Sequence, residues 1–142
     1  MGIAFSLGRG NELLLQSARS LTRGLRGLSL GEIATNFAAC WRRVTGVDDG
    51  QLLWMGPEKG PVHQASACLV NALWDAWAKY EGLPVWKLVT SLPPAQLAAA
   101  IDLKGVEDAL GNAQEVASTL TRAADGKEER VKVAADESPV DV

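Results

Sequence analysis

Apolar residues recur at helical spacing over most of the chain. In the first such segment Asn11 stands at a suitable N-cap position, and Gly24 and Gly27 mark the expected end of a helix. The apolar face of this predicted helix consists of Leu14, Ala18, Leu21 and Leu25.

A second helix is predicted after Ser29, because Ser29 and Glu32 match a capping box. Gly46 and the Asp-Asp-Gly run at 48–50 are expected to end it. Its inward face consists of Leu30, Ile33, Phe37, Cys40, Trp41 and Val44.

The most apolar segment is residues 62–81. Pro61 suits the first turn of a helix, and Gly82 and Pro84 end the pattern. Apolar residues lie almost all round this predicted helix, which indicates a central element buried on most sides. They are Ala65, Cys68, Leu69, Val70, Ala72, Leu73, Trp74, Ala76 and Trp77. One more short helical stretch is expected at 85–89.

Strand signals are few. Residues 3–7 are apolar and precede a Gly-Arg-Gly turn, which predicts one strand, and residues 97–103 are compatible with a strand or a helix. A single strand has no hydrogen-bonding partner of its own. The pattern therefore predicts a mostly α chain with an α+β remnant.

Towards the C-terminus the helical signal weakens. Asn112 and Glu115 match a second capping pattern, opening a helix that carries Val116 and Leu120 inward. Residues 126–142 are charged and aperiodic, so we expect a disordered tail.

Composition and charge restrict the function classes. Hydrophobic residues are 47% and charged residues 22% of the 142 positions, which fits a globular domain. The net charge of −3 argues against a general nucleic-acid binder. Residues 1–44 hold six Arg against two Glu, and residues 99–142 hold ten acids against five bases, which we interpret as solvated faces and an acidic tail. With neither a long apolar run nor signal-peptide features, we expect no membrane association and a cytoplasmic location.

Candidate chemical groups are sparse. Cys40 and Cys68 lie inside apolar helical patterns, which favours buried free thiols over a disulfide or a metal pair. His63 has no base, nucleophile or metal partner nearby in sequence, so a structural role is favoured. Asp75 is expected to bond to a neighbouring helix or to cap a loop, because an unpaired buried charge is costly.

The turn at Gly8, Arg9 and Gly10 is the best candidate for ligand contact. It has two of the three glycines of a dinucleotide fingerprint but no βαβ context, so a plain turn is favoured. An anion contact by Arg9 at a helix N-terminus stays open.

Three other features are weak signals. Asp102 and Lys104 give little indication of an active-site edge, and residues 56–60 lack the ending of a phosphate loop. The tryptophans are interpreted as core and interface anchors rather than a nucleic-acid stacking platform. They are Trp41, Trp54, Trp74, Trp77 and Trp86.

Four segments together resemble one enzyme family. They are FSLGRGNE at 5–12, GQLLWMGPEKGPVH at 50–63, VNALWDAWAK at 70–79 and EGLPVWKL at 81–88. They resemble L-fuconate dehydratase-like members of the enolase superfamily, in its mandelate racemase/muconate lactonizing enzyme branch, and the similarity extends from about Gly2 to about Lys132.

This resemblance implies a helical capping domain followed by a (β/α) barrel. In the family, three barrel acids hold Mg²⁺, and a Lys-x-Lys motif with a His–Asp pair moves the protons while water leaves a sugar acid. A barrel needs about 250 residues, and its series of acids is absent here. The nearest approach to Lys-x-Lys is Arg-Val-Lys at 130–132.

The predicted organisation is a helical cap at 1–90, the entry to a truncated barrel at 91–125, including a possible first barrel strand, and the tail at 126–142. No catalytic or metal residue can be carried over, and Arg9 is the only substrate-proximal candidate. We therefore expect a hydro-lyase by lineage, inactive alone, whose full-length form uses Mg²⁺ and a sugar acid. The alternative is a non-catalytic module that docks on a homologue or another protein, or self-associates through an exposed apolar face.

Overall fold

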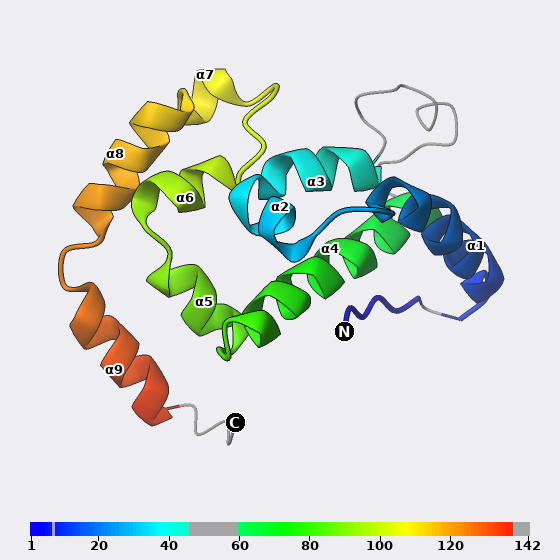
Figure 1. Ribbon diagram of the computed structural model, residues 1–142, viewed down its shortest axis with the longest axis horizontal. Helices are drawn as coiled ribbons and strands as arrows, with labels where there is room; N and C mark the ends of the chain where they lie inside the picture. Colours follow the sequence, from blue (N-terminus) through cyan, green and yellow to red (C-terminus); the bar gives the residue numbers. More distant parts are fainter. Residues whose placement is uncertain (7, 46–59, 138–142) are drawn as a thin grey trace.

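The computed structural model describes residues 1–6, 8–45 and 60–137. Over this part the chain is helical, which confirms the predicted mostly α fold class (Figure 1). The helices of the N-terminal half are α1 (Asn11–Leu21), η1 (Thr22–Leu25, a 3-10 helix), α2 (Leu30–Thr35), α3 (Phe37–Thr45) and α4 (Pro61–Tyr80). Those of the C-terminal half are α5 (Val85–Ser91), α6 (Pro94–Ala99), α7 (Glu107–Leu110), α8 (Ala113–Ala123) and α9 (Lys127–Glu137).

The 20-residue helix α4 is the central element, as its apolar pattern predicted. Pro61 occupies its first turn, where a missing N–H costs nothing. Helices α1, α2 and α3 pack against α4, and α5 continues from its C-terminal end (Figure 1). Helices α6 and α8 pack together, and α7, α8 and α9 form an outer arc on the left of the view in Figure 1.

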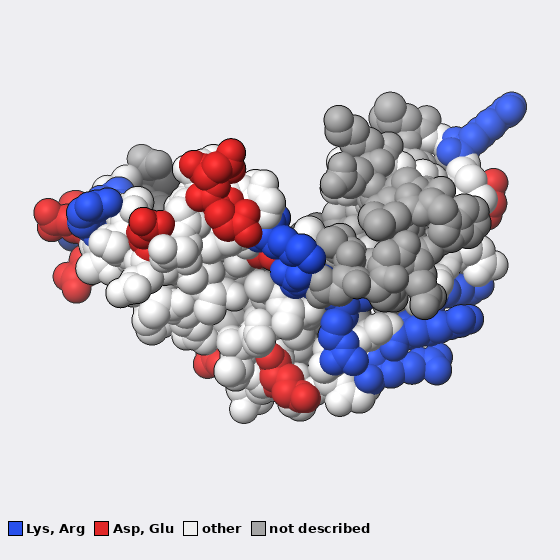
Figure 2. Space-filling model, turned by 90° about the horizontal axis from the view of Figure 1, so that it is seen from above, with Lys and Arg blue, Asp and Glu red and all other residues white. Residues whose placement is uncertain are grey.

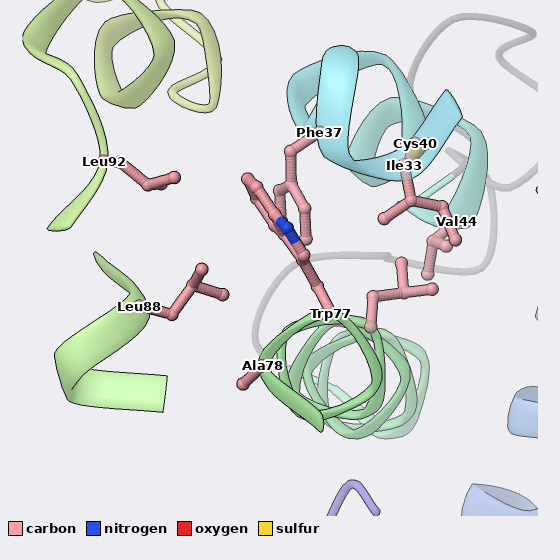
Figure 3. Packing of buried hydrophobic residues seen from close by; sticks show 9 residues of the cluster. Ile33, Phe37, Cys40, Val44, Trp77, Ala78, Leu88 and Leu92 are labelled. Carbon is pink, nitrogen blue, oxygen red and sulfur yellow. The ribbon is translucent and has the colours of Figure 1, made fainter. Parts of the chain in front are cut away.

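Two apolar clusters hold helices α1 to α5 together. In the larger one, Trp77 points from α4 towards Phe37, while Leu88 and Leu92 approach from the opposite side (Figure 3). Its buried members are Ile33, Phe37, Cys40, Val44, Leu73, Trp77, Ala78, Leu88 and Leu92. The smaller cluster joins α1 to the first turns of α4 and consists of Leu21, Val62 and Ala65. The helical face predicted for α1 is therefore used, although only Leu21 is fully buried.

The capping box at Ser29 and Glu32 is confirmed, but the predicted second helix is two helices. The backbone departs from helical geometry at Asn36, where φ is −144° and ψ is 66°. The Asn36 side chain accepts a hydrogen bond from the Ala39 N–H at 3.2 Å. Asparagine competes with the helix in this way. Leu30, predicted to face inward, is 36% exposed.

The start of α1 also differs from the prediction. Gly10, with φ of 99°, is the N-cap residue, and Asn11 is the first residue of the helix. The expected side-chain cap by Asn11 is therefore wrong.

Neither predicted strand forms among the described residues. Residues 1–6 have no regular secondary structure, and residue 7 lies outside the described part. No second strand is available in that part to supply ladder hydrogen bonds. Residues 97–103 are also not a strand, because α6 continues to Ala99 and a turn follows. The alanines there follow their helix propensity.

The predicted disordered tail is wrong for most of its length, since α9 occupies Lys127–Glu137. Lysine, glutamate and alanine are good helix formers even without a strong apolar period. Residues 138–142 lie outside the described part. The boundaries predicted at 90 and 125 stay predictions. No helix in the described part is long and apolar enough to cross a membrane.

Candidate functional site

Arg9 lies in the turn that leads into α1. Gly8 and Gly10 flank it with φ angles of 134° and 99°, a backbone region that suits glycine. The Ser6 hydroxyl donates a hydrogen bond to Oδ1 of Asn11 at 2.5 Å, which ties the incoming segment to the helix. The Arg9 side chain is exposed at the helix N-terminus. Its position near a substrate stays a prediction.

The N-terminal segment lies directly on α4. The Cys68 thiol donates a hydrogen bond to the Gly2 carbonyl at 3.1 Å, and the Met1 amino group pairs with Asp75. A Cβ atom on Gly2 would come within 1.8 Å of the Cys68 carbonyl oxygen, so only glycine fits this approach.

Asp75 has its partners close by. Its Oδ2 accepts a hydrogen bond from Nζ of Lys79 at 2.8 Å, one turn along the same helix. The Asp75 side chain is 27% exposed. The prediction of a partnered carboxylate is thus confirmed, but the partners are on α4 itself and on the N-terminal segment.

A partly buried ion pair joins distant parts of the chain. Nη1 of Arg42 on α3 lies 2.9 Å from Oδ1 of Asp102, and these side chains are 24% and 15% exposed. The amide of Gln96 on α6 adds a hydrogen bond to the Ala34 carbonyl at 3.3 Å. Asp102 therefore holds the segment after α6 against α3. Sequence reasoning missed this pair, because a separation of 60 residues leaves no local signal.

Tryptophan packing agrees with a structural role. The ring of Trp74 lies 4.1 Å from Phe37 and 5.4 Å from Trp77, measured between centroids. Trp86 on α5 is 36% exposed, and Trp54 lies outside the described residues. The stacked rings are in the core, where they cannot serve as a platform for nucleic-acid bases.

The thiols and the histidine do not form a reactive group. Both cysteines are free, Cys40 buried and Cys68 half-buried, so the buried-thiol prediction holds fully only for Cys40. Burial raises the pKa of the Cys40 thiol, with the charge of Arg43 opposing this rise. A raised thiol pKa lowers the thiolate fraction and hence reactivity. His63 is exposed on the first turn of α4.

The described residues do not fit a magnesium site. Magnesium prefers carboxylate oxygens converging on one point. Within residues 1–6, 8–45 and 60–137, no group of three or more His, Cys, Asp or Glu side chains could hold a metal ion. The acidic residues at 48–49 and residues 56–59 of the glycine-rich segment lie outside the described part.

Comparison with known proteins gives a consistent relationship. No protein-family model matches the chain. Mitochondrial enolase superfamily member 1 of Bos taurus is 43% identical over 129 residues, which cover 91% of this chain and 28% of that protein. The crystal structure of the human protein of the same name matches the fold with a TM-score of 0.85 and 40% identity, over 92% of this chain and 29% of that one. The match lies in its N-terminal region. This chain is related to the N-terminal region of enolase-superfamily proteins.

A fungal relative has a name that states an activity. L-galactonate dehydratase of Hypocrea jecorina is 35% identical over 133 residues, covering 94% of this chain and 29% of that protein. The chain thus spans less than a third of the length of the curated relatives it matches. The similarity supports the superfamily relationship predicted from the sequence, and the helical fold is that of the N-terminal cap.

Proposed function

We propose that this chain is the capping region of a sugar-acid dehydratase, a magnesium-dependent L-fuconate dehydratase-like hydro-lyase, and that it is inactive alone. The match to the N-terminal region of the human enolase-superfamily structure, with a TM-score of 0.85, carries the proposal. In the family that the chain resembles, a helical cap closes over the mouth of a barrel, and the metal and the proton-transfer groups belong to the barrel, whose C-terminal face is where the active sites of such barrels lie.

The chemistry of the described residues supports the inactive part of the proposal. Among the described residues, ion pairs join Arg42 to Asp102, and the Met1 amino group and Lys79 to Asp75. Neither arrangement includes a nucleophile with an adjacent base or a set of metal ligands. Both are explained by packing of the helices.

An assay for sugar-acid dehydration tests this proposal. The purified chain is incubated with Mg²⁺ and either L-fuconate or L-galactonate, and keto-acid product is measured. The fungal L-galactonate dehydratase serves as the positive control under the same conditions. We expect no product above the no-protein blank, and metal-dependent turnover by the chain would overturn the proposal.

We further propose that Arg9 lies close to the sugar acid when a barrel is present. An Arg side chain at a helix N-terminus suits a carboxylate. The test is a chimera in which this chain replaces the matching region of the human relative. If the chimera turns over a sugar acid, Arg9→Met should raise KM about tenfold, and Arg19→Met, a second exposed arginine on α1, should not. Equal kinetics for the two variants would contradict the role.

A second candidate function is a non-catalytic interaction module. The observation in its favour is the exposure of Met1, Ile3 and Phe5, at 78%, 67% and 83% of their surfaces. Exposed apolar side chains that adjoin one another mark contact surfaces. Size-exclusion chromatography with light scattering, together with binding of the dye ANS, tests it. A monodisperse monomer that binds no dye would exclude self-association and an exposed docking face.

The cytoplasmic location stays a prediction. The bovine and human relatives carry the word mitochondrial in their names, which concerns those proteins, and the fungal L-galactonate dehydratase does not. Fractionation of cells that express the chain with a C-terminal tag would test the prediction, and recovery in mitochondria would contradict it.

A further inference from the structure

A groove opens between α5–α6 on one side and α8–α9 on the other. It encloses about 250 Å³. Trp86 and Val89 of α5, Leu97 of α6 and Leu120 of α8 form its apolar walls. This volume is smaller than the usual pocket for a drug-sized ligand, and it has room for roughly eight to ten non-hydrogen atoms.

One face of α9 completes the groove. Lys127, Arg130, Val131 and Ala134 all line it, and their spacing of three, one and three residues places them on a single helical face. Arg130 and Ala134 are exposed, and Lys127 and Val131 are only half-buried. The described residues therefore leave space in front of this face.

The charges of the lining are of one sign. Lys127 and Arg130 are its two ionisable residues, whereas the chain as a whole carries a net charge of −3. The guanidinium of Arg130 donates to the carbonyl oxygens of Asp125 and Ala123 at 2.7 and 2.6 Å, which fixes it at the end of α8. Two of its five N–H donors are used there, so three are left. Among the described residues, the side chain of Lys127 has no ion pair or hydrogen bond.

The cationic pair of Lys127 and Arg130 lies apart from the arginines of the N-terminal half. Figure 2 shows most Lys and Arg side chains of that face towards the end of the molecule that holds α1, with others near the middle and the opposite end, and with acidic side chains scattered between them. Lys127 and Arg130 lie at the opposite end, on a helix whose first turn also carries Glu128 and Glu129. Those two acids do not line the groove. The two cations of the groove are thus surrounded mainly by its apolar lining.

We propose that this groove binds a small amphipathic monocarboxylate, with its hydrocarbon part between Trp86 and Leu97 and its carboxylate at Lys127 and Arg130. Apolar walls favour the hydrocarbon, and the two cationic side chains of the lining favour an anionic head group. An uncharged hydrocarbon ligand would leave the two cations without an anionic partner. A short anion would leave the apolar walls exposed to water. The proposal does not rest on the proposed function, because every residue that it uses belongs to this chain.

Octanoate, with ten non-hydrogen atoms, is the probe. In isothermal titration with the full chain we expect one saturable site with Kd of about 0.1–1 mM. Octan-1-ol should bind about tenfold more weakly than octanoate, because it lacks the negative charge. Acetate should not bind, because it lacks the long hydrocarbon tail. Absence of saturable octanoate binding, or equal affinity for octan-1-ol, would overturn the proposal.

Two pairs of α9 variants separate the groove from the rest of the helix surface. Lys127→Met should weaken octanoate about tenfold, whereas Lys132→Met, on a face that does not line the groove, should leave it unchanged. Ala134→Trp should fill the groove and abolish binding, while Ala135→Trp should not. Equal effects within either pair would show that octanoate binds elsewhere. Circular dichroism of each variant establishes that the helices are retained.

Discussion

The helices around α4 and the arm formed by α7, α8 and α9 have similar local signals but different packing. Both regions contain a complete capping box, at Ser29 and Glu32 before α2 and at Asn112 and Glu115 before α8. Nine buried residues join α2, α3, α4 and the α5 segment in one cluster. Helices α7 and α8 have no buried residue, and α8 half-buries Val116 and Leu120.

This difference shows that caps and amphipathic spacing fix where a helix forms but not how strongly it is held. Most helix stability in proteins comes from packing of the apolar face. The helices around α4 (the body) are packed against one another from several directions. The arm has α6 on one side and the groove or solvent on the other. Local opening is therefore expected to occur in the arm first.

Replacing Trp77 by alanine should have the largest effect on stability. Trp77 is 2% exposed and stacks on Trp74, so its removal leaves a cavity in the main cluster. Trp77→Ala should lower the free energy of unfolding by about 3–5 kcal/mol, measured by urea denaturation followed by circular dichroism.

The matched control for that prediction is Trp86→Ala. Trp86 is 36% exposed at the edge of the groove, so its loss should cost about 1 kcal/mol or less. Equal losses for the two variants would show that the α5 wall of the groove is as well packed as the core around Trp77.

The two capping boxes provide a comparison of intermediate size. Ser29→Ala removes the acceptor for the Glu32 N–H and should lower the free energy of global unfolding by about 1 kcal/mol. Asn112→Ala removes the equivalent acceptors for Gln114 and Glu115 N–H groups. Because α8 buries no residue completely, this second loss should appear as faster amide exchange in the first turn of α8, with a change in global stability below about 0.5 kcal/mol. A loss of equal size from both variants would show that the arm and the body unfold together.

The sequence predicted most helices, because their signals are local. The box at Ser29, the proline at the start of α4 and the box at Asn112 each act within one turn. Features that depend on distant partners were missed. The ion pair of Arg42 and Asp102 spans 60 residues, and nothing in either neighbourhood indicates it.

The wrong predictions have a common physical origin. Residues 3–7 carry a strand pattern, but a strand needs a neighbouring strand, and the described residues supply none. The segment after Gly126 has a charged composition, yet its residues are good helix formers and one face of α9 adjoins an apolar wall. Arg9 is exposed in the turn where it was predicted. Its role near a substrate stays a prediction, because the substrate would be bound by residues outside this chain.

The smallest expected effect concerns how the free energy of unfolding of the body falls at acidic pH. The Ser29 N–H, at 2.7 Å, and then its hydroxyl, at 2.8 Å, stabilise the Glu32 carboxylate and lower its pKa below the ordinary 4.5. A group whose pKa is lower in the folded chain stabilises the fold above its unfolded pKa, and this contribution is lost as pH falls through the folded value. The free energy of unfolding, measured at a series of pH values from 7 to 3, should therefore fall less steeply below about pH 4.5 in Glu32→Gln than in the parent chain.

Glu115→Gln, the same change in the arm, should leave the slope for global unfolding unchanged, because α8 contributes no buried residue to the core. A steeper slope in Glu32→Gln, or an equal change in both variants, would show that the capping box of α2 is not tied to the stability of the body.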